Sequence, residues 1–118
     1  MTLQELYAKI NGNYAEAQNR LMKESFIERF ALMYLKDDSF VSLQNAISAG
    51  SIPDCFRAAH TLKGVAANLA FTELQQAASE LTEQLRPLTA PADAAMVEVL
   101  KVAHEKVVAA LNEYNASK

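Results

Sequence analysis

Apolar residues recur at spacings of three and four along almost the whole chain, and no stretch sustains the strict alternation of a β-strand. This spacing places apolar side chains on one face of a helix. Glycine and proline mostly fall between the periodic segments or in a first turn, where they interrupt or start helices. The sequence therefore predicts an all-α fold.

The same pattern gives the predicted helices, which cover approximately residues 2–10, 14–22, 25–36, 39–49, 51–69, 72–88 and 92–114. Because the connections are short, neighbouring helices should be antiparallel. We expect an antiparallel up-and-down four-helix bundle with short additional N-terminal helices at one end. Residues 1–118 should form a single domain, with the bundle core at about 25–116. Thr72 to Gln75 has the pattern of a capping box, which would open its helix.

The Phe, Met and Leu stripes of these helices are expected to form the core. They include Phe26, Phe30, Met33 and Tyr34 in the third segment, Ile47 in the fourth and Leu88 at the end of the sixth. His104 lies off the inward stripe of the last helix and is interpreted as a plain surface histidine.

Composition limits the class of protein. The chain has 118 residues, 51% of them hydrophobic, and a single cysteine, Cys55. It is long enough to bury one core without metals or disulfides, and one cysteine fits a reducing compartment. Neither a membrane-spanning run nor a secretory leader is apparent. We therefore expect a cytoplasmic protein, and Met1 favours a stand-alone chain.

Several functions are excluded by charge and motif. The formal net charge is −3, which argues against nucleic-acid binding. Three glycines are too few for a phosphate-binding loop or a dinucleotide fingerprint. Cys55 and His60 point to opposite faces of their helix, so they form neither a metal site nor a Cys-His pair. We expect no metal and no cofactor on this chain.

The segment Ala58-Ala59-His60-Thr61-Leu62-Lys63-Gly64 carries the chemistry. In a helix, the core side consists of small and apolar residues: Cys55, Ala58, Ala59, Leu62, Val65, Ala66 and Leu69. His60 points the opposite way. Its neighbours at helical spacings are Phe56, Arg57, Lys63, Gly64 and Ala67.

Gly64 stands inside the clearest helical pattern of the chain, where glycine costs about 1 kcal/mol relative to alanine. Its missing Cβ leaves room beside His60 for a bulky group or for the backbone of another protein. Lys63 is a mobile cation suited to phosphoryl oxygens. The combination predicts a histidine that accepts a phosphoryl group at Nε2 while Lys63 screens the charge. An imidazole in water is largely neutral at pH 7, as this attack requires.

The run His60-Thr61-Leu62-Lys63-Gly64, with Ala58-Ala59 before it and Ala66-Ala67-Asn68-Leu69 after it, resembles the signature of histidine-containing phosphotransfer (HPt) domains. The resemblance is strongest over about residues 50–87. It implies a helical bundle that carries phosphate between receiver-domain aspartates in a His-Asp phosphorelay.

Some positions differ from the pattern of the family. Val65 stands where relatives have alanine or a small polar residue, and Ala70 where they have glycine, which suggests a tighter or differently shaped turn. Many relatives hold the second ring nitrogen with an amide on the neighbouring helix. The residue level with His60 there is about Thr82, which leaves open which residue holds that nitrogen. Arg86 could reach phosphoryl oxygens from that helix.

The resemblance also implies the partners, which are a response-regulator receiver domain and a hybrid sensor histidine kinase. Mg²⁺ is expected on the receiver, and this chain would be a phosphocarrier without enzymatic machinery. We expect a monomer that docks its partner through Phe56, Arg57 and Ala67, beside His60. The alternative is an interaction module that binds and inhibits a receiver or kinase without being phosphorylated.

Overall fold

The computed structural model describes residues 1–118 and is entirely helical. Its elements are α1 (Leu3–Lys9), α2 (Tyr14–Leu21), α3 (Glu24–Met33), the 3-10 helix η1 (Tyr34–Lys36), α4 (Ser39–Ala49), α5 (Ile52–Leu69), α6 (Thr72–Leu85) and α7 (Ala94–Ala116). The all-α prediction is confirmed, and each predicted helix is present within a few residues of its expected bounds. No helix combines the length and the apolar character that crossing a membrane would require.

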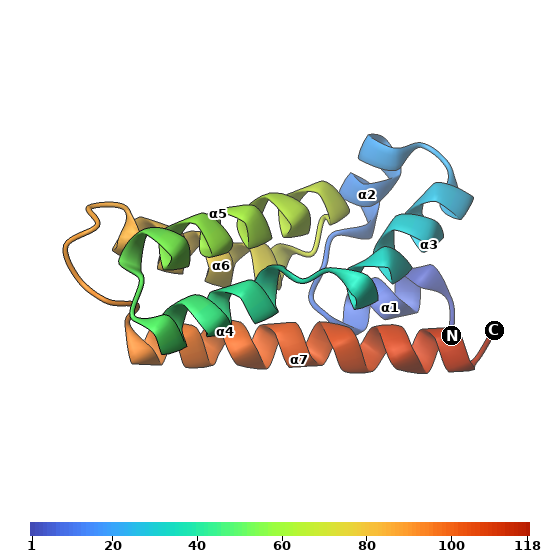
Figure 1. Ribbon diagram of the computed structural model, residues 1–118. Coiled ribbons are helices and arrows are strands. Elements are labelled where there is room, and N and C mark those ends of the chain that lie inside the picture. Colours follow the sequence, from blue (N-terminus) through green and yellow to red (C-terminus); the bar gives the residue numbers. More distant parts are fainter.

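Helices α4, α5, α6 and α7 form the long part of the bundle (Figure 1). Helix α5 packs against α4 and α6, and α6 packs against α7, which runs the length of the molecule. The shorter helices α1 to α3 gather at the end where both termini lie, away from the loop between α6 and α7. This is the predicted arrangement of bundle and N-terminal helices.

The apolar residues form one continuous core of 30 buried residues, to which every α-helix contributes. The N-terminal end is tied to α5 by Tyr7, whose hydroxyl donates a hydrogen bond to the carbonyl of Leu69 at 2.8 Å. Burial raises the pKa of Tyr7. Helix α1 thus fixes the end of α5 and is an integral part of the core.

The turn between α5 and α6 is made by Ala70, which adopts the left-handed conformation at φ 58° and ψ 35°. Its carbonyl accepts a hydrogen bond from the Asn13 amide at 2.9 Å, and the Phe71 amide closes back on the Ala66 carbonyl at 3.0 Å. The expected difference in turn shape is therefore wrong. Alanine takes the conformation that glycine would supply, at a steric cost that buried contacts of the turn offset.

The start and end of α6 also differ from expectation. Phe71 is the N-cap, no side chain caps this helix, and the Thr72 hydroxyl donates instead to the Ala70 carbonyl at 3.5 Å. The predicted capping box is absent. The helix ends at Leu85, so Leu88 lies beyond it and is 47% exposed.

The third segment turns its bulkiest side chains outward. Phe26, Phe30 and Met33 are 41%, 38% and 54% exposed, whereas Ile27 and Ala31 on the same helix are buried. The prediction that these three residues belong to the core is wrong. Of that stripe, only Tyr34 is buried, as expected. The inward prediction for Ile47 also fails, since this residue is 37% exposed. Val65 is half-buried and packs against the core, as expected for the inner face of α5.

Candidate functional site

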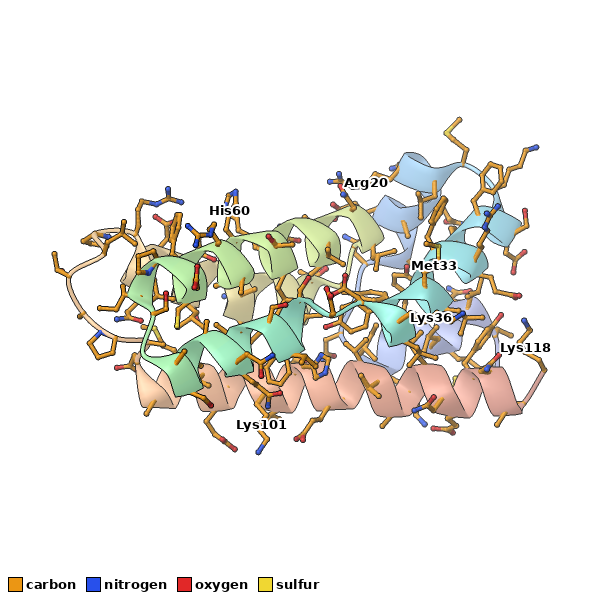
Figure 2. All side chains as sticks on the ribbon, in the orientation of Figure 1. Arg20, Met33, Lys36, His60, Lys101 and Lys118 are labelled. Atoms are coloured by element: carbon orange, nitrogen blue, oxygen red, sulfur yellow. The ribbon has the colours of Figure 1, made fainter.

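Helix α5 presents His60 because both its start and its buried face are strongly specified. The Ser51 hydroxyl caps the helix by accepting a hydrogen bond from the Asp54 amide at 3.3 Å, and Pro53 lies in the first turn. The predicted core side is buried at Cys55, Ala58, Ala59, Leu62, Ala66 and Leu69. Because these residues pack inward, the imidazole of His60 projects to solvent on the side away from α7 (Figure 2).

The neighbours of His60 on α5 match the predicted face. The Phe56 ring stacks on the imidazole, with ring centroids 5.9 Å apart. Lys63 is half-buried, and Gly64 is exposed. A Cβ built at Gly64 would have no neighbouring atom within 4 Å outside its own helical turn. Packing within this chain therefore gives no reason for glycine at this position.

Helix α6 adds a charged pair to the same surface. The guanidinium of Arg86 lies over the Phe56 ring at 5.4 Å, and it bonds both carboxylate oxygens of Glu83 at 2.7 to 3.1 Å. This hydrogen bonding from Arg86 lowers the pKa of Glu83, and the charges of Arg86, Lys63 and His60 add to the effect. Arg86 therefore lies next to the ring that covers His60.

Sequence reasoning missed Glu83. Two signals were available: its spacing of three from Arg86, typical of a helical ion pair, and its position immediately after the residue expected level with His60.

Thr82, the residue expected level with His60 and considered as a possible support for its ring, makes no hydrogen bond to it in this structure. Its side chain is fully buried, and its hydroxyl donates to the Ala78 carbonyl of its own helix at 2.7 Å. This is the usual back-bond of a helical threonine, and it uses the only hydroxyl proton. The exposed imidazole of His60 and the buried hydroxyl of Thr82 thus lie in different environments, and no hydrogen bond joins them.

The other predicted contact residues lie on the outer side of α5. Arg57 is exposed and forms an ion pair with Asp54 in the first turn. Ala67 is half-buried one turn beyond Gly64. These two residues extend the surface around His60 in both directions along the helix. Phe56 is half-buried and packs partly against the core, so it joins the interior to the site.

A groove extends from this side of α5 toward the N-terminal helices, and no feature of the sequence predicted it. Its volume is about 650 Å³. Its lining includes Phe30, Met33 and Val65, with the cations Arg20 and Lys36 also in its wall. Figure 2 shows Arg20 on the same side of the molecule as His60, with Met33 nearby on α3. The outward apolar residues of α3 therefore border the surface of α5.

His104 is not the plain surface residue that was predicted. Its ring stacks on Phe40 at 4.2 Å between centroids, and its Nδ1 shares a 2.7 Å hydrogen bond with the hydroxyl of Tyr34. Burial lowers the pKa of His104, while Glu105 and Asp37 act in the opposite direction. This histidine connects α7 to η1 and α4, so its surroundings indicate a packing role.

Comparison with known proteins adds one result to this geometry. A family model described as Hpt domain matches residues 37–112, more than half of the chain. No curated protein and no solved structure matches the chain. The matched region includes α4, α5 and α6 and most of α7, and so contains His60 and the residues around it.

Proposed function

Because the chain belongs to the Hpt domain family, whose members are phosphocarrier modules of phosphorelays, we propose that it accepts a phosphoryl group on His60 and passes it to a receiver domain. The observation that carries this proposal is one exposed surface of α5. There His60, Lys63 and Gly64 lie together, and open space adjoins the glycine.

The proposed reaction uses the imidazole as nucleophile. Nε2 of His60 attacks the phosphorus of a receiver aspartyl phosphate, an N–P bond forms, and the P–O bond to the carboxylate breaks with its electron pair staying on oxygen. The proton on Nδ1 of the phosphorylated ring is released to solvent. Passing the group on reverses these changes. The receiver would supply Mg²⁺, and this chain would supply the nucleophile and the cations.

Two cations are suited to the phosphoryl oxygens. Lys63 lies one turn after His60 on the same helix, and Arg86 lies over Phe56 from α6. A lysine acts as a mobile point charge, and an arginine offers two parallel donors to phosphate. We propose that both residues stabilise the phosphoryl group while it resides on His60.

The receiver would dock across Phe56, Gly64 and Ala67, with Arg57 at the edge and the groove beside Met33 as an extension. Exposed apolar area next to a reactive group is typical of interaction sites. The contact should be small, because a carrier must release one partner before it meets another. A hybrid sensor kinase is the proposed source of phosphate in such a relay.

Intact mass spectrometry tests the proposal directly. The chain is incubated with a phosphorylated receiver, and we expect one phosphoryl adduct that is labile in acid and stable in base. His60→Gln should carry none, and the matched variant His104→Gln should accept phosphate like the wild type. An adduct on His60→Gln would contradict the assignment. Receiver binding without any adduct on the wild type would instead support the unphosphorylated interaction module.

A further inference from the structure

We propose that Glu83 is a counter-charge that destabilises phosphorylated His60 and thereby favours release of the phosphoryl group to the next receiver. The proposal rests on the function proposed above. The proposed phosphotransfer does not itself use the carboxylate of Glu83. The inference gives this carboxylate a role because it lies beside His60.

The position of Glu83 follows from the register of the two helices. Arg86 covers the Phe56 ring, and Phe56 in turn stacks on His60. Because α5 and α6 are antiparallel neighbours (Figure 1), moving back along α6 by one turn corresponds to moving forward along α5 by one turn. The residue one turn before Arg86 is Glu83, and the residue one turn after Phe56 is His60. Glu83 is therefore level with the imidazole.

The electrostatic surroundings agree with this register. Three positively charged or protonatable groups act on the Glu83 carboxylate, namely Arg86, Lys63 and His60, and each lowers its pKa. The carboxylate is therefore charged at neutral pH. Both members of the Glu83 and Arg86 pair are more than half exposed, which leaves them free to reorient when the local charge changes.

A charge count shows the expected effect. Around unphosphorylated His60, the side chains of Lys63, Arg86 and Glu83 together carry one net positive charge. Once the Nδ1 proton has been released, the phosphoryl group leaves nearly two negative charges on the ring at pH 7. With Glu83 present the phosphorylated site becomes net negative, whereas without it the charges would almost balance. Glu83 therefore raises the free energy of the phosphorylated state.

Arg86 gives the effect a second component. In the unphosphorylated protein its guanidinium donates hydrogen bonds to both carboxylate oxygens of Glu83. Phosphoryl oxygens must compete with that carboxylate for the same donors, so part of the stabilisation by Arg86 is withheld. A carrier that held its phosphoryl group too tightly would not pass it on. The pair thus keeps the N–P bond easier to break by transfer to a receiver carboxylate.

The test is the equilibrium of phosphoryl transfer between a phosphorylated receiver and this chain, read by intact mass. Glu83→Gln should shift the equilibrium toward phosphorylated His60 by about threefold to tenfold at low ionic strength, the range expected for one exposed charge near the phosphoryl group. Arg86→Gln should shift it the opposite way. The matched control is Glu80→Gln, which removes an exposed carboxylate of the same helix at the groove toward α7.

Salt separates an electrostatic role from a structural one. In about 0.5 M salt the difference between Glu83→Gln and the wild type should shrink, because screening shortens the range of the charge. An equilibrium that Glu83→Gln leaves unchanged or shifts toward the receiver would overturn the inference while leaving phosphotransfer by His60 intact. A wild type that takes up no phosphate from the receiver would overturn the proposed function, and the inference with it.

Discussion

The rings of Phe56 and His60 lie almost parallel, at an interplanar angle of 14°. With centroids 5.9 Å apart the two rings are offset, so Phe56 lies alongside the imidazole, and Phe56 is itself packed partly against the core. Arg86 covers the Phe56 ring in turn. We therefore propose two roles for Phe56: it orients the ring of His60, and it contributes apolar surface to docking.

Two substitutions at Phe56 separate these roles. Phe56→Glu should weaken receiver binding by about tenfold or more, because it removes apolar area from the centre of the contact. Phe56→Leu should retain most of the affinity but slow transfer, because the stack on His60 is lost. Affinity is measured by receiver titration followed through backbone amide shifts, and circular dichroism checks the fold. Wild-type affinity in Phe56→Glu would remove this residue from the docking surface.

Gly64→Ala tests why a glycine lies inside α5. The new methyl group meets open space, and alanine favours a helix, so the free energy of unfolding should stay the same or rise by up to about 1 kcal/mol. Phosphotransfer should slow, because the methyl group occupies space beside the reacting ring. Urea denaturation and single-turnover transfer measure the two effects. A variant that is less stable and fully active would show that the glycine serves packing.

The sequence specified α5 well and α3 poorly, for a physical reason. In α5 the inward residues are small and continuous, which leaves one possible direction for His60. In α3 two stripes at helical spacing compete, one with Phe26 and Phe30 and the other with Ile27 and Ala31. Periodicity alone cannot choose between them, and the bulkier stripe faces outward.

Contacts between segments far apart in the chain could not be predicted from the sequence either. The partners of His104 are Tyr34 of η1, 70 residues earlier, and Phe40 of α4, 64 residues earlier. Such contacts leave no pattern in the local sequence spacing. Glu83 and Arg86 illustrate the intermediate case. Their ion pair is local and could have been predicted from their spacing of three residues. Their closeness to His60 depends on the alignment of α5 with α6, which the spacing does not show.

Thr82→Val tests the buried hydroxyl on α6. Because this hydroxyl is engaged with the Ala78 carbonyl and does not bond His60, the transfer rate should match the wild type. Stability should change by no more than about 1 kcal/mol, since the shape is kept and one back-bond is lost. Loss of transfer in a variant that remains folded would show that the hydroxyl supports the ring after all.

Met33→Ser tests whether the groove beside α3 belongs to the docking surface. Met33 is 54% exposed and lines this groove, so its loss should reduce receiver affinity severalfold while the fold persists. Val99→Ser is the matched control, because Val99 is 56% exposed but lies on α7 at a different groove. Equal effects of the two variants on receiver titration would exclude a specific role for the α3 groove.

His104 should make the stability of the bundle depend on pH. Burial lowers its pKa in the folded state below the ordinary value of 6.5, so the unfolded chain takes up the proton more readily. The contribution of neutral His104 to the free energy of unfolding is therefore fully present above pH 6.5. It is lost as the pH falls below that value, before carboxylates begin to protonate near 4.5. In the protonated ring both nitrogens are donors, so Nδ1 can then only donate to the Tyr34 hydroxyl.

Urea unfolding at pH 7.5 and pH 5.5 measures this dependence. The midpoint of the wild type should be lower at pH 5.5, and His104→Gln should remove most of the difference, because glutamine does not titrate. His60→Gln is the matched control, because it removes the other histidine of the chain, and it should keep the dependence. If His104→Gln loses as much stability between the two pH values as the wild type, another group must be responsible, and the contact between Tyr34 and His104 does not sense pH.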